Sequence, residues 1–250
     1  MKIVNKKLNI SEFREYLAQK TFKLKPNMNV LHHTWRPTKE QWQGQKSIGG
    51  MKSFYENKGW PAGPHIYIYE GDIWLFTDMA NVGIHAGGAN ATWRKGDKVV
   101  TGYGPYRGYE LESYSIGIEV VGNYESQLWD EKTKETVLEV LCALEDILGI
   151  TKIGFHRDYQ VKASGCPGWA ITKEWLNREL LLFKRKNMFD IQNAIDTWED
   201  AKEAVEWGEK NKIFSSRDGF NEDTFRSFLM SYRMQKIAAK EMLQQLIDKL

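Results

Sequence analysis

The chain has 250 residues, of which 42% are hydrophobic and 13% aromatic, so it can bury a full core and still form a second, small unit. Its 35 basic and 33 acidic residues give a net charge of +2, which excludes the basic surface that a nucleic-acid-binding protein usually carries. No apolar run reaches the roughly 18 to 20 residues that span a bilayer, and the first residues show no apolar stretch of signal-peptide length. We therefore expect a globular protein made in the cytoplasm, with no nucleic-acid partner and no membrane insertion.

The hydrophobic pattern alternates between the strand period and the helix period along much of the chain. In chain order it predicts a strand at 28–33, a helix at 47–59, two strands within 65–78, a strand at 114–123, a helix at 130–149, a short strand that opens the segment 151–168, and a helix at 171–186. The strand at 114–123 is apolar almost throughout, as expected in the centre of a sheet with both faces covered. This mixture predicts an α/β domain.

The two cysteines, Cys142 and Cys166, are too few for a disulfide framework. Cys142 falls on the apolar pattern of the helix at 130–149, where a small buried side chain is the simplest interpretation. Cys166 stands in a loop, directly before Pro167 and Gly168, which favour a tight turn of the backbone. A thiolate fixed in this way can close on a metal ion at a small cost in entropy.

Several polar residues that suit a metal site lie in or just after the predicted strands. His32 and His33 end one strand, Glu119 lies in the central strand, and one loop supplies His156 and Cys166. Each residue alone is more often structural than functional, but two imidazoles and a thiolate together are a normal zinc set. Three protein ligands leave the fourth position open for water or substrate, which is typical of a catalytic site. The pattern itself does not choose between the two adjacent histidines.

Four motifs carry a resemblance to a known family. The segments "VLHHT", "GIHAGG", "SIGIEVVGN" and "FHRDY" followed by "CPG", in this order and at these separations, resemble the zinc-dependent N-acetylmuramoyl-L-alanine amidases of type 2. That family includes phage endolysins and is related in fold to animal peptidoglycan recognition proteins. The resemblance extends over roughly residues 25 to 180. It implies a mixed central β-sheet flanked by helices, a Zn²⁺ cofactor, and peptidoglycan as the partner, through its glycan strand and stem peptide.

The resemblance also assigns the metal ligands. In the family the first histidine of the pair binds zinc, which implies His32, together with His156 and Cys166, as the metal set. His33 is then expected to pack or to hydrogen-bond behind the site. A structural zinc domain would instead close the fourth position with another cysteine or histidine at short spacing, and Cys142 lies far from this loop.

Glu119 is the candidate general base. A carboxylate in a central apolar strand is costly to bury unless it is paired or used. Relatives place either a tyrosine or a glutamate of "IGIE" near the water that zinc activates, and this sequence has Pro64 at the tyrosine position but keeps Glu119. The resemblance therefore implies that Glu119 takes a proton from water and hands it to the departing amine. The alternative is a buried structural salt bridge.

The loop before Cys166 departs from the family pattern. Relatives often carry a lysine two residues before the last ligand, where its ammonium group stabilises the oxyanion of the tetrahedral intermediate. Ser164 occupies this position, and we expect Lys162 to replace the missing lysine as a catalytic residue. Ser164 can donate a weaker hydrogen bond to the substrate. The alternative for Lys162 is an exposed loop lysine.

Further residues are candidates for substrate binding. The family places a histidine such as His85 of "GIHAGG" at the rim of the groove, where it contacts the peptide or the glycan. His65 is expected to be a structural histidine beside the site. Trp35, Trp60 and Trp93 can stack on sugar faces or pack in the core, and we assign Trp60 to substrate binding.

The character of the sequence changes after residue 185, where glycines become rare and the remaining pattern indicates short helices. We expect a zinc amidase catalytic domain at 1–185 and a small all-α domain at 186–250. Segments of this tail resemble wall-binding repeats of the surface-layer-homology type, which implies contact with a cell-wall polymer. The alternative is a helical appendage for dimerisation or stability.

These observations lead to one expected function. The protein is expected to cleave the amide bond between N-acetylmuramic acid and L-alanine in peptidoglycan, as a phage or prophage endolysin. It would be made in the host cytoplasm without a signal peptide and would act at the cell wall after release. The alternative is a non-catalytic peptidoglycan-binding receptor, but such relatives typically lack a zinc ligand, and all three candidates are present here.

Overall fold

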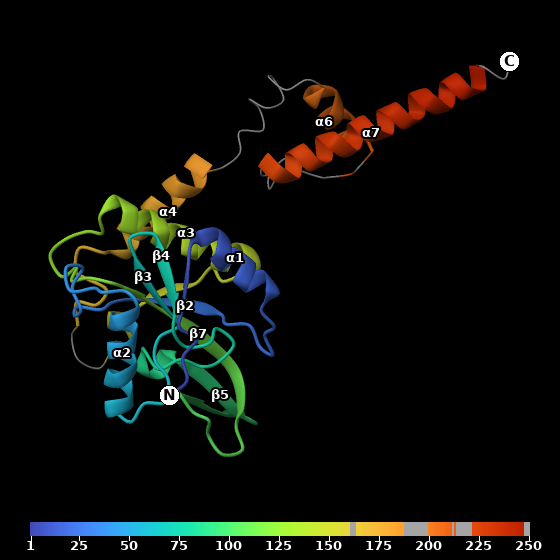
Figure 1. The fold of residues 1–250 in the computed structure, drawn as a ribbon. Coiled ribbons are helices and arrows are strands. Elements are labelled where there is room, and N and C mark those ends of the chain that lie inside the picture. The colour runs from blue at the N-terminus through green and yellow to red at the C-terminus, as the bar shows by residue number, and fades with distance from the viewer. Residues whose placement is uncertain (161–163, 188–199, 212, 214–221, 248–250) are drawn as a thin grey trace. The chain divides into compact units, whose positions relative to one another are not determined.

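In the computed structural model the chain divides into two compact units, Met1–Leu180 and Leu181–Leu250. The structure describes residues 1–160, 164–187, 200–211, 213 and 222–247 (Figure 1). The first unit contains a β-sheet and its covering helices, and the described part of the second unit is helical.

A mixed β-sheet forms the centre of the first unit. Its strands within the described residues are β1 (Lys6–Leu8), β2 (Met28–His33), β3 (Ile66–Tyr69), β4 (Asp72–Leu75), β5 (Ala91–Lys95), β6 (Lys98–Thr101), β7 (Glu110–Val120) and β8 (Ile153–Phe155). They follow the order β1-β4-β3-β7-β2-β8, and β5 pairs with the first half of β7 and with β6. The strand β7 is parallel to β2 and β3, β2 is parallel to β8, and the other pairs are antiparallel.

The register of the central strands brings two expected site residues side by side. All six residues of β2 are buried, as is usual for a strand between two parallel neighbours. His32 of β2 lies opposite Glu119 of β7, and Tyr67 of β3 lies opposite Glu119 on its other side. Residues that pair across a sheet share a face, so His32 and Glu119 belong to one face and His33 to the other.

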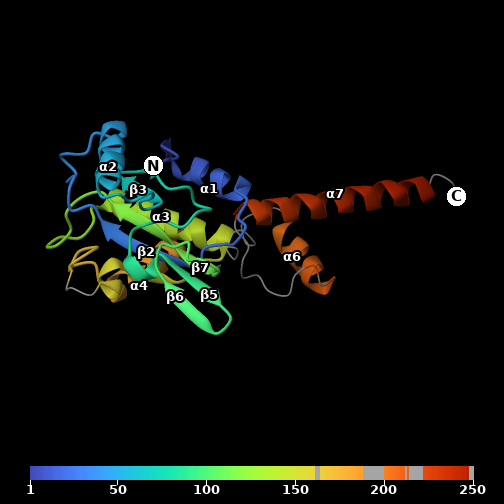
Figure 2. The same ribbon diagram turned by 90° about the horizontal axis from the view of Figure 1, so that it is seen from below.

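Helices cover both faces of the sheet (Figures 1 and 2). Helix α2 (Gln45–Asn57) follows β2, and its Tyr55 packs into an aromatic cluster with Tyr67 on the face that carries the site. Helices α1 (Ile10–Gln19) and α3 (Glu131–Leu148) pack against each other on the opposite face. The two central crossovers therefore place their helices on opposite sides, as right-handed connections in opposite directions along a sheet require.

Helix α3 has a strong signal at each end. Asp130 is the N-cap, and its carboxylate accepts the backbone N–H of Thr133 at 3.0 Å and the hydroxyl of Thr133 at 2.8 Å. Gly149 ends the helix in the left-handed region, with a φ of 76°, which glycine adopts without steric cost. The helix expected at 130–149 is confirmed.

The sheet with helices on both faces confirms the expected α/β fold class. Periodicity predicted no element over β1, α1 or the β5–β6 hairpin, and the structure adds all of them. A local signal for α1 was present, because Asn9 and Glu12 form a capping box at its start, with the Glu12 N–H donating to Asn9 Oδ1 at 2.9 Å. The hairpin is exposed along most of its length and therefore lacks a clear apolar alternation.

The second unit is helical in its described part. It contains α6 (Ala201–Lys210) and α7 (Glu222–Ile247), after the last residues of α4 (Lys173–Asn187). Helices α6 and α7 share a small core in which Val205 and Phe225 are buried. None of the described helices is long and apolar enough to cross a membrane.

Candidate metal centre and active-site groove

Three expected metal ligands converge at one end of the parallel strands. His32 lies near the end of β2, His156 begins the short 3-10 helix η2 (His156–Tyr159) directly after β8, and Cys166 lies in the loop that follows. One donor atom from each side chain lies within 4.8 Å of the donors of the other two. The ring centroids of His32 and His156 are 4.4 Å apart. Two imidazoles and a thiol at these separations form a donor set of the kind that binds zinc with an open fourth position.

The ring of His32 is 1% exposed, and each of its nitrogens has a different neighbour. Nε2 lies 3.1 Å from Nδ1 of His85, and Nδ1 lies 3.9 Å from Oε1 of Glu119. Burial lowers the pKa of His32 well below its ordinary value, and the neighbouring His156 lowers it further. The ring is therefore neutral near pH 7, which is the form that binds a metal.

Contacts with backbone groups hold Cys166 and the loop that carries it. The thiol sulfur accepts the backbone N–H of His33 at 3.4 Å, and burial raises the pKa of the Cys166 thiol. A buried thiolate at this point is therefore favourable only beside a cation, which fits a metal ligand. The Arg157 guanidinium donates to the carbonyls of Gly168 at 2.7 Å and Ile171 at 2.6 Å, and so fixes the loop that carries Cys166.

The backbone conformation and the close neighbours of Gly168 explain why glycine ends the "CPG" motif. Its φ of 126° lies in the region that favours glycine. A Cβ atom at this position would collide with the backbone carbonyl of Tyr124. The backbone N–H of Tyr124 in turn donates to Nδ1 of His33 at 3.1 Å. A backbone N–H thus holds the ring of His33, whose own backbone N–H contacts Cys166.

Glu119 is buried beside the cluster without a strong partner. It is 8% exposed, and its Oε2 has no hydrogen-bond partner among the described residues. Burial raises the pKa of Glu119 to about 8. An unpaired carboxylate oxygen in such a place costs free energy unless a cation or a reacting group uses it. This oxygen and the three donors together fit a site for a divalent metal with an adjacent base.

The cluster borders a groove of about 980 Å³, which is lined by residues of β2, β7, α2 and several loops but not by Cys166. His32, Glu119 and His156 line it, and so do Trp60 and Trp35, which are 41% and 52% exposed. The groove therefore joins the polar cluster to exposed aromatic side chains, an arrangement that suits a ligand with both polar and flat apolar parts.

His85 also lines the groove, but both of its ring nitrogens have protein neighbours. Nδ1 lies 3.1 Å from His32 Nε2, and Nε2 lies 3.2 Å from the hydroxyl oxygen of Ser115. Sequence reasoning missed Ser115 and Asn90, which fix the His85 segment. A buried serine in the apolar strand β7 was the available signal, because a hydroxyl there needs a partner.

Ser164 and Lys162 were the candidates for oxyanion stabilisation. The hydroxyl oxygen of Ser164 accepts the backbone N–H of Cys166 at 3.2 Å, so this side chain caps the ligand loop. Lys162 lies outside the described residues.

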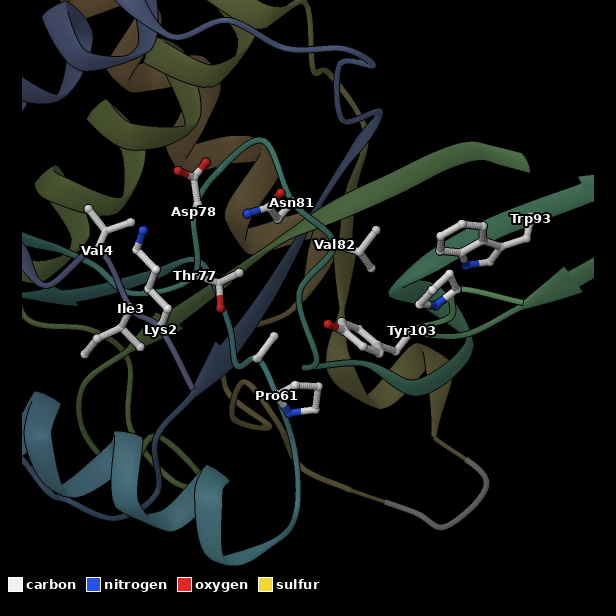
Figure 3. A pocket seen from close by; sticks show the side chains of 12 residues that line it. Lys2, Ile3, Val4, Pro61, Thr77, Asp78, Asn81, Val82, Trp93 and Tyr103 are labelled. Atoms are coloured by element: carbon white, nitrogen blue, oxygen red, sulfur yellow. The ribbon is translucent and has the colours of Figure 1, made fainter. Parts of the chain in front are cut away.

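A second cavity of about 480 Å³ adjoins the groove (Figure 3). Pro61 and Tyr103 line both spaces and therefore stand between them. Trp93 lies beside Tyr103, at the end of the cavity away from Lys2. It is only 8% exposed, and its Nε1–H donates to the Gly102 carbonyl at 3.3 Å. Packing thus accounts for this tryptophan. His65 is fully buried between Asn81 and β7.

One family model and several solved structures are similar to this chain. Residues 22–169 match the family model described as N-acetylmuramoyl-L-alanine amidase. Similar solved structures include the amidase LysC from Clostridium intestinale (22% identity, 66% of this chain and 91% of that one, TM-score 0.48). Others are Drosophila PGRP-LB (18%, 60% and 78%, TM-score 0.40) and Apis mellifera PGRP-SA (16%, 66% and 93%, TM-score 0.41). No curated protein sequence matches the chain. Because the match to the family model spans more than half of the chain, the protein belongs to the N-acetylmuramoyl-L-alanine amidase family.

Proposed function

We propose that this protein is a zinc-dependent hydrolase that cleaves the amide bond between the lactyl group of N-acetylmuramic acid and L-alanine in peptidoglycan. The observation that carries the proposal is a cluster of three metal donors beside an unpaired buried carboxylate, with two of the donors and the carboxylate lining one groove. Membership in the amidase family supports the same reaction.

His32, His156 and Cys166 would hold the zinc ion. When bound, the ion polarises the scissile carbonyl and lowers the pKa of a water molecule to about 7. The protein prepares the donor atoms for this role. The His32 ring is kept neutral by burial, and the Cys166 sulfur already accepts one backbone N–H, which lowers the cost of its anionic form.

Glu119 would act as the general base and then as the general acid. Its carboxylate takes a proton from the attacking water and delivers it to the nitrogen of the departing L-alanine. Its position supports both steps, because Oε1 faces His32 Nδ1 and Oε2 is free of protein partners among the described residues. A carboxylate with a pKa raised by burial also takes up a proton more readily than an exposed one.

Substrate contacts are assigned to the walls of the groove. Trp60 offers an exposed ring at the groove, and its centroid lies 5.7 Å from that of Tyr55, which also lines the groove. Such a ring can stack on the face of a sugar. We assign to Lys162 the stabilisation of the oxyanion that forms in the tetrahedral intermediate. Ser164 serves mainly to hold the loop that carries Cys166.

An endolysin role is the biological context of this proposal. The proposed catalytic residues all lie in the first compact unit, and we assign the second unit to attachment to a wall polymer. The purified protein added to intact bacteria tests this context, because an endolysin lowers the turbidity of the suspension and a regulator of soluble fragments does not.

The reaction is tested on purified peptidoglycan. Cleavage at the proposed bond releases a new free amine on L-alanine and no new reducing sugar, and a chelator abolishes the release until zinc is restored. New reducing ends would assign the protein to glycan cleavage instead. Binding of walls without any new end group would favour the non-catalytic receptor.

A further inference from the structure

His85 belongs to a chain of polar contacts that leads away from the proposed metal site. His32 Nε2 lies 3.1 Å from His85 Nδ1, and His85 Nε2 lies 3.2 Å from Ser115 Oγ. Ser115 Oγ in turn lies 2.6 Å from the backbone carbonyl of Ala89. The contacts therefore form one line from the buried histidine of β2 to a fixed carbonyl oxygen.

The direction of each hydrogen bond follows from the last one. A carbonyl oxygen only accepts, so the single hydroxyl proton of Ser115 is donated to Ala89. Ser115 Oγ can then only accept from His85, which places the ring proton of His85 on Nε2. A neutral imidazole has one N–H, so His85 Nδ1 is an acceptor, and the proton of His32 must lie on Nε2.

The direction matters because His32 has a competing neighbour on its other side. Glu119 Oε1 lies 3.9 Å from His32 Nδ1 and would attract a proton to that nitrogen. Because His85 takes up Nε2, Nδ1 is the His32 nitrogen that is left for a metal ion, and a proton on Nδ1 would occupy its lone pair. The shorter contact with His85 favours the proton on Nε2 and leaves Nδ1 free.

The fold holds His85 in this position with several backbone contacts. Its ring lies against Gly117 of β7, where a Cβ atom would come within 2.5 Å of the ring. The side-chain oxygen of Asn90 accepts the backbone N–H groups of His85 and Ala86 at 3.0 and 2.7 Å. Ser115 ties the same segment to β7 by donating its N–H to the Asn90 carbonyl at 3.1 Å.

We infer that His85 and Ser115 are positioning residues that set the tautomer of His32 and so direct its Nδ1 lone pair to the metal. His85 then acts through His32 and does not offer a ring nitrogen to the substrate. The inference rests on the proposed zinc site, but not on the identity of the substrate. A partner on the second nitrogen of a metal-bound histidine typically changes metal affinity 10- to 100-fold.

The decisive variant is Ser115→Ala, because it removes the acceptor of His85 Nε2–H without touching either imidazole. The proton of His85 can then move to Nδ1 and donate to His32 Nε2, which sends the proton of His32 to Nδ1. Ser115→Thr is the matched control, because it keeps the hydroxyl group on a buried strand position. Circular dichroism and thermal unfolding establish that each variant is folded. His85→Ala is a second test of the same chain of hydrogen bonds.

Two measurements read the outcome. Nitrogen-15 NMR of the imidazoles in the metal-free protein reports the tautomer, and the chain has only five histidines to assign. Competition with a chromophoric chelator reports the dissociation constant of zinc. We expect an Nε2–H tautomer at His32 in the wild-type protein, and a shift toward Nδ1–H with roughly 10- to 100-fold weaker zinc binding in Ser115→Ala. Ser115→Thr should keep both properties.

A wild-type His32 with its proton on Nδ1 would overturn the inference. So would zinc binding by Ser115→Ala and His85→Ala within threefold of wild type, or an equal loss in Ser115→Ala and Ser115→Thr, which would indicate packing alone. Neither measurement uses peptidoglycan. A protein with the expected tautomer and zinc affinity that releases no alanine amine would therefore refute the proposed function and leave this inference standing.

Discussion

Helix α3 and the metal cluster lie in the same unit but satisfy their polar groups in different ways. In α3 the partners are close in sequence, as for Asp130 with Thr133 at the N-cap. In the cluster, His32, Glu119 and Cys166 come from three distant segments, and one oxygen of Glu119 has no hydrogen-bond partner in the described part of the chain. The N-cap of the helix therefore has its hydrogen-bond partners within the protein, whereas the cluster keeps donor atoms that a bound cation would use in the proposed function. Four changes test this contrast, from the largest expected effect to the smallest.

Cys166→Ala should abolish activity. It removes one of three donors, and we expect zinc affinity to fall by more than roughly 100-fold, beyond the cost of losing an outer partner of a ligand. The zinc content after dialysis and the release of alanine amine are the two measurements. Cys142→Ala is the matched control, because Cys142 is a buried cysteine of α3 outside the donor set, and it should keep both zinc and activity. Full zinc content in Cys166→Ala would remove the cysteine from the proposed site.

Glu119→Gln should keep zinc and the fold but lower turnover by roughly 10²- to 10⁴-fold, which corresponds to about 3 to 5 kcal/mol of barrier. The amide has the shape of the carboxylate but cannot take the proton from water. Glu112→Gln on the same strand is the control, because Glu112 is an exposed partner of Arg94. Turnover by Glu119→Gln within threefold of wild type would assign Glu119 to a structural role.

Asp130→Ala should leave activity unchanged and lower the free energy of unfolding by about 1 kcal/mol, because it removes the N-cap of α3. Chemical denaturation measures this loss. The control is Glu131→Ala, since Glu131 is an exposed residue of the first turn. A change in turnover would mean that the helix end and the cluster are coupled.

Asp130 also makes the free energy of unfolding depend on pH. Burial raises the pKa of Asp130, but hydrogen bonds from Lys39 and Thr133 outweigh it and lower the pKa to about 2. A folded-state pKa below the ordinary 3.8 stabilises the protein above pH 3.8, and this contribution is lost as the pH falls toward about 2. The difference between wild type and Asp130→Ala should therefore shrink over this range, and a constant difference would contradict the assignment.

Truncation after Arg185 should have the smallest effect on small soluble muropeptides, with turnover within about twofold of the full chain, because the described site residues lie in the first unit. Lysis of intact cells should fall, since a wall-binding unit raises the local enzyme concentration only at an insoluble substrate. Both rates are measured on both proteins. Equal losses on the two substrates would make the tail part of the catalytic fold, and a halved mass in light scattering would identify it as a dimerisation unit.

Elements whose contacts are close in sequence could be predicted more fully than those that depend on distant segments. Helix α3 and strand β2 were predicted because their signals are local, in a cap residue, a terminal glycine and an unbroken apolar run. The hairpin β5–β6 was not predicted, because residues such as Arg94 and Lys98 are exposed on it and leave no apolar alternation. Its turn signal at Gly96 was present but was not sufficient alone.

The site could be predicted only in part, because it depends on contacts between segments that are distant in sequence. The periodicity did not choose between His32 and His33, and only the family resemblance did. The pairing of His32 with Glu119 across β2 and β7 gives the structural basis, because a shift by one residue would exchange the two histidines. The contact of His85 with Ser115 depends on pairing between segments 30 residues apart in sequence, which no local pattern contains.

The sequence distance between the metal donors has a consequence for the unfolded chain. His32 and Cys166 are roughly 130 residues apart, so a cation held by both closes a loop that includes most of the first unit. In the chain-entropy treatment of cross-links, closing a loop of this size is worth about 4 to 5 kcal/mol. A bound ion would then act like a reversible disulfide in a protein whose Cys142 and Cys166 are not joined by a disulfide bond. If the proposed zinc site is correct, the protein would resist unfolding more strongly where zinc is available than where it is scarce.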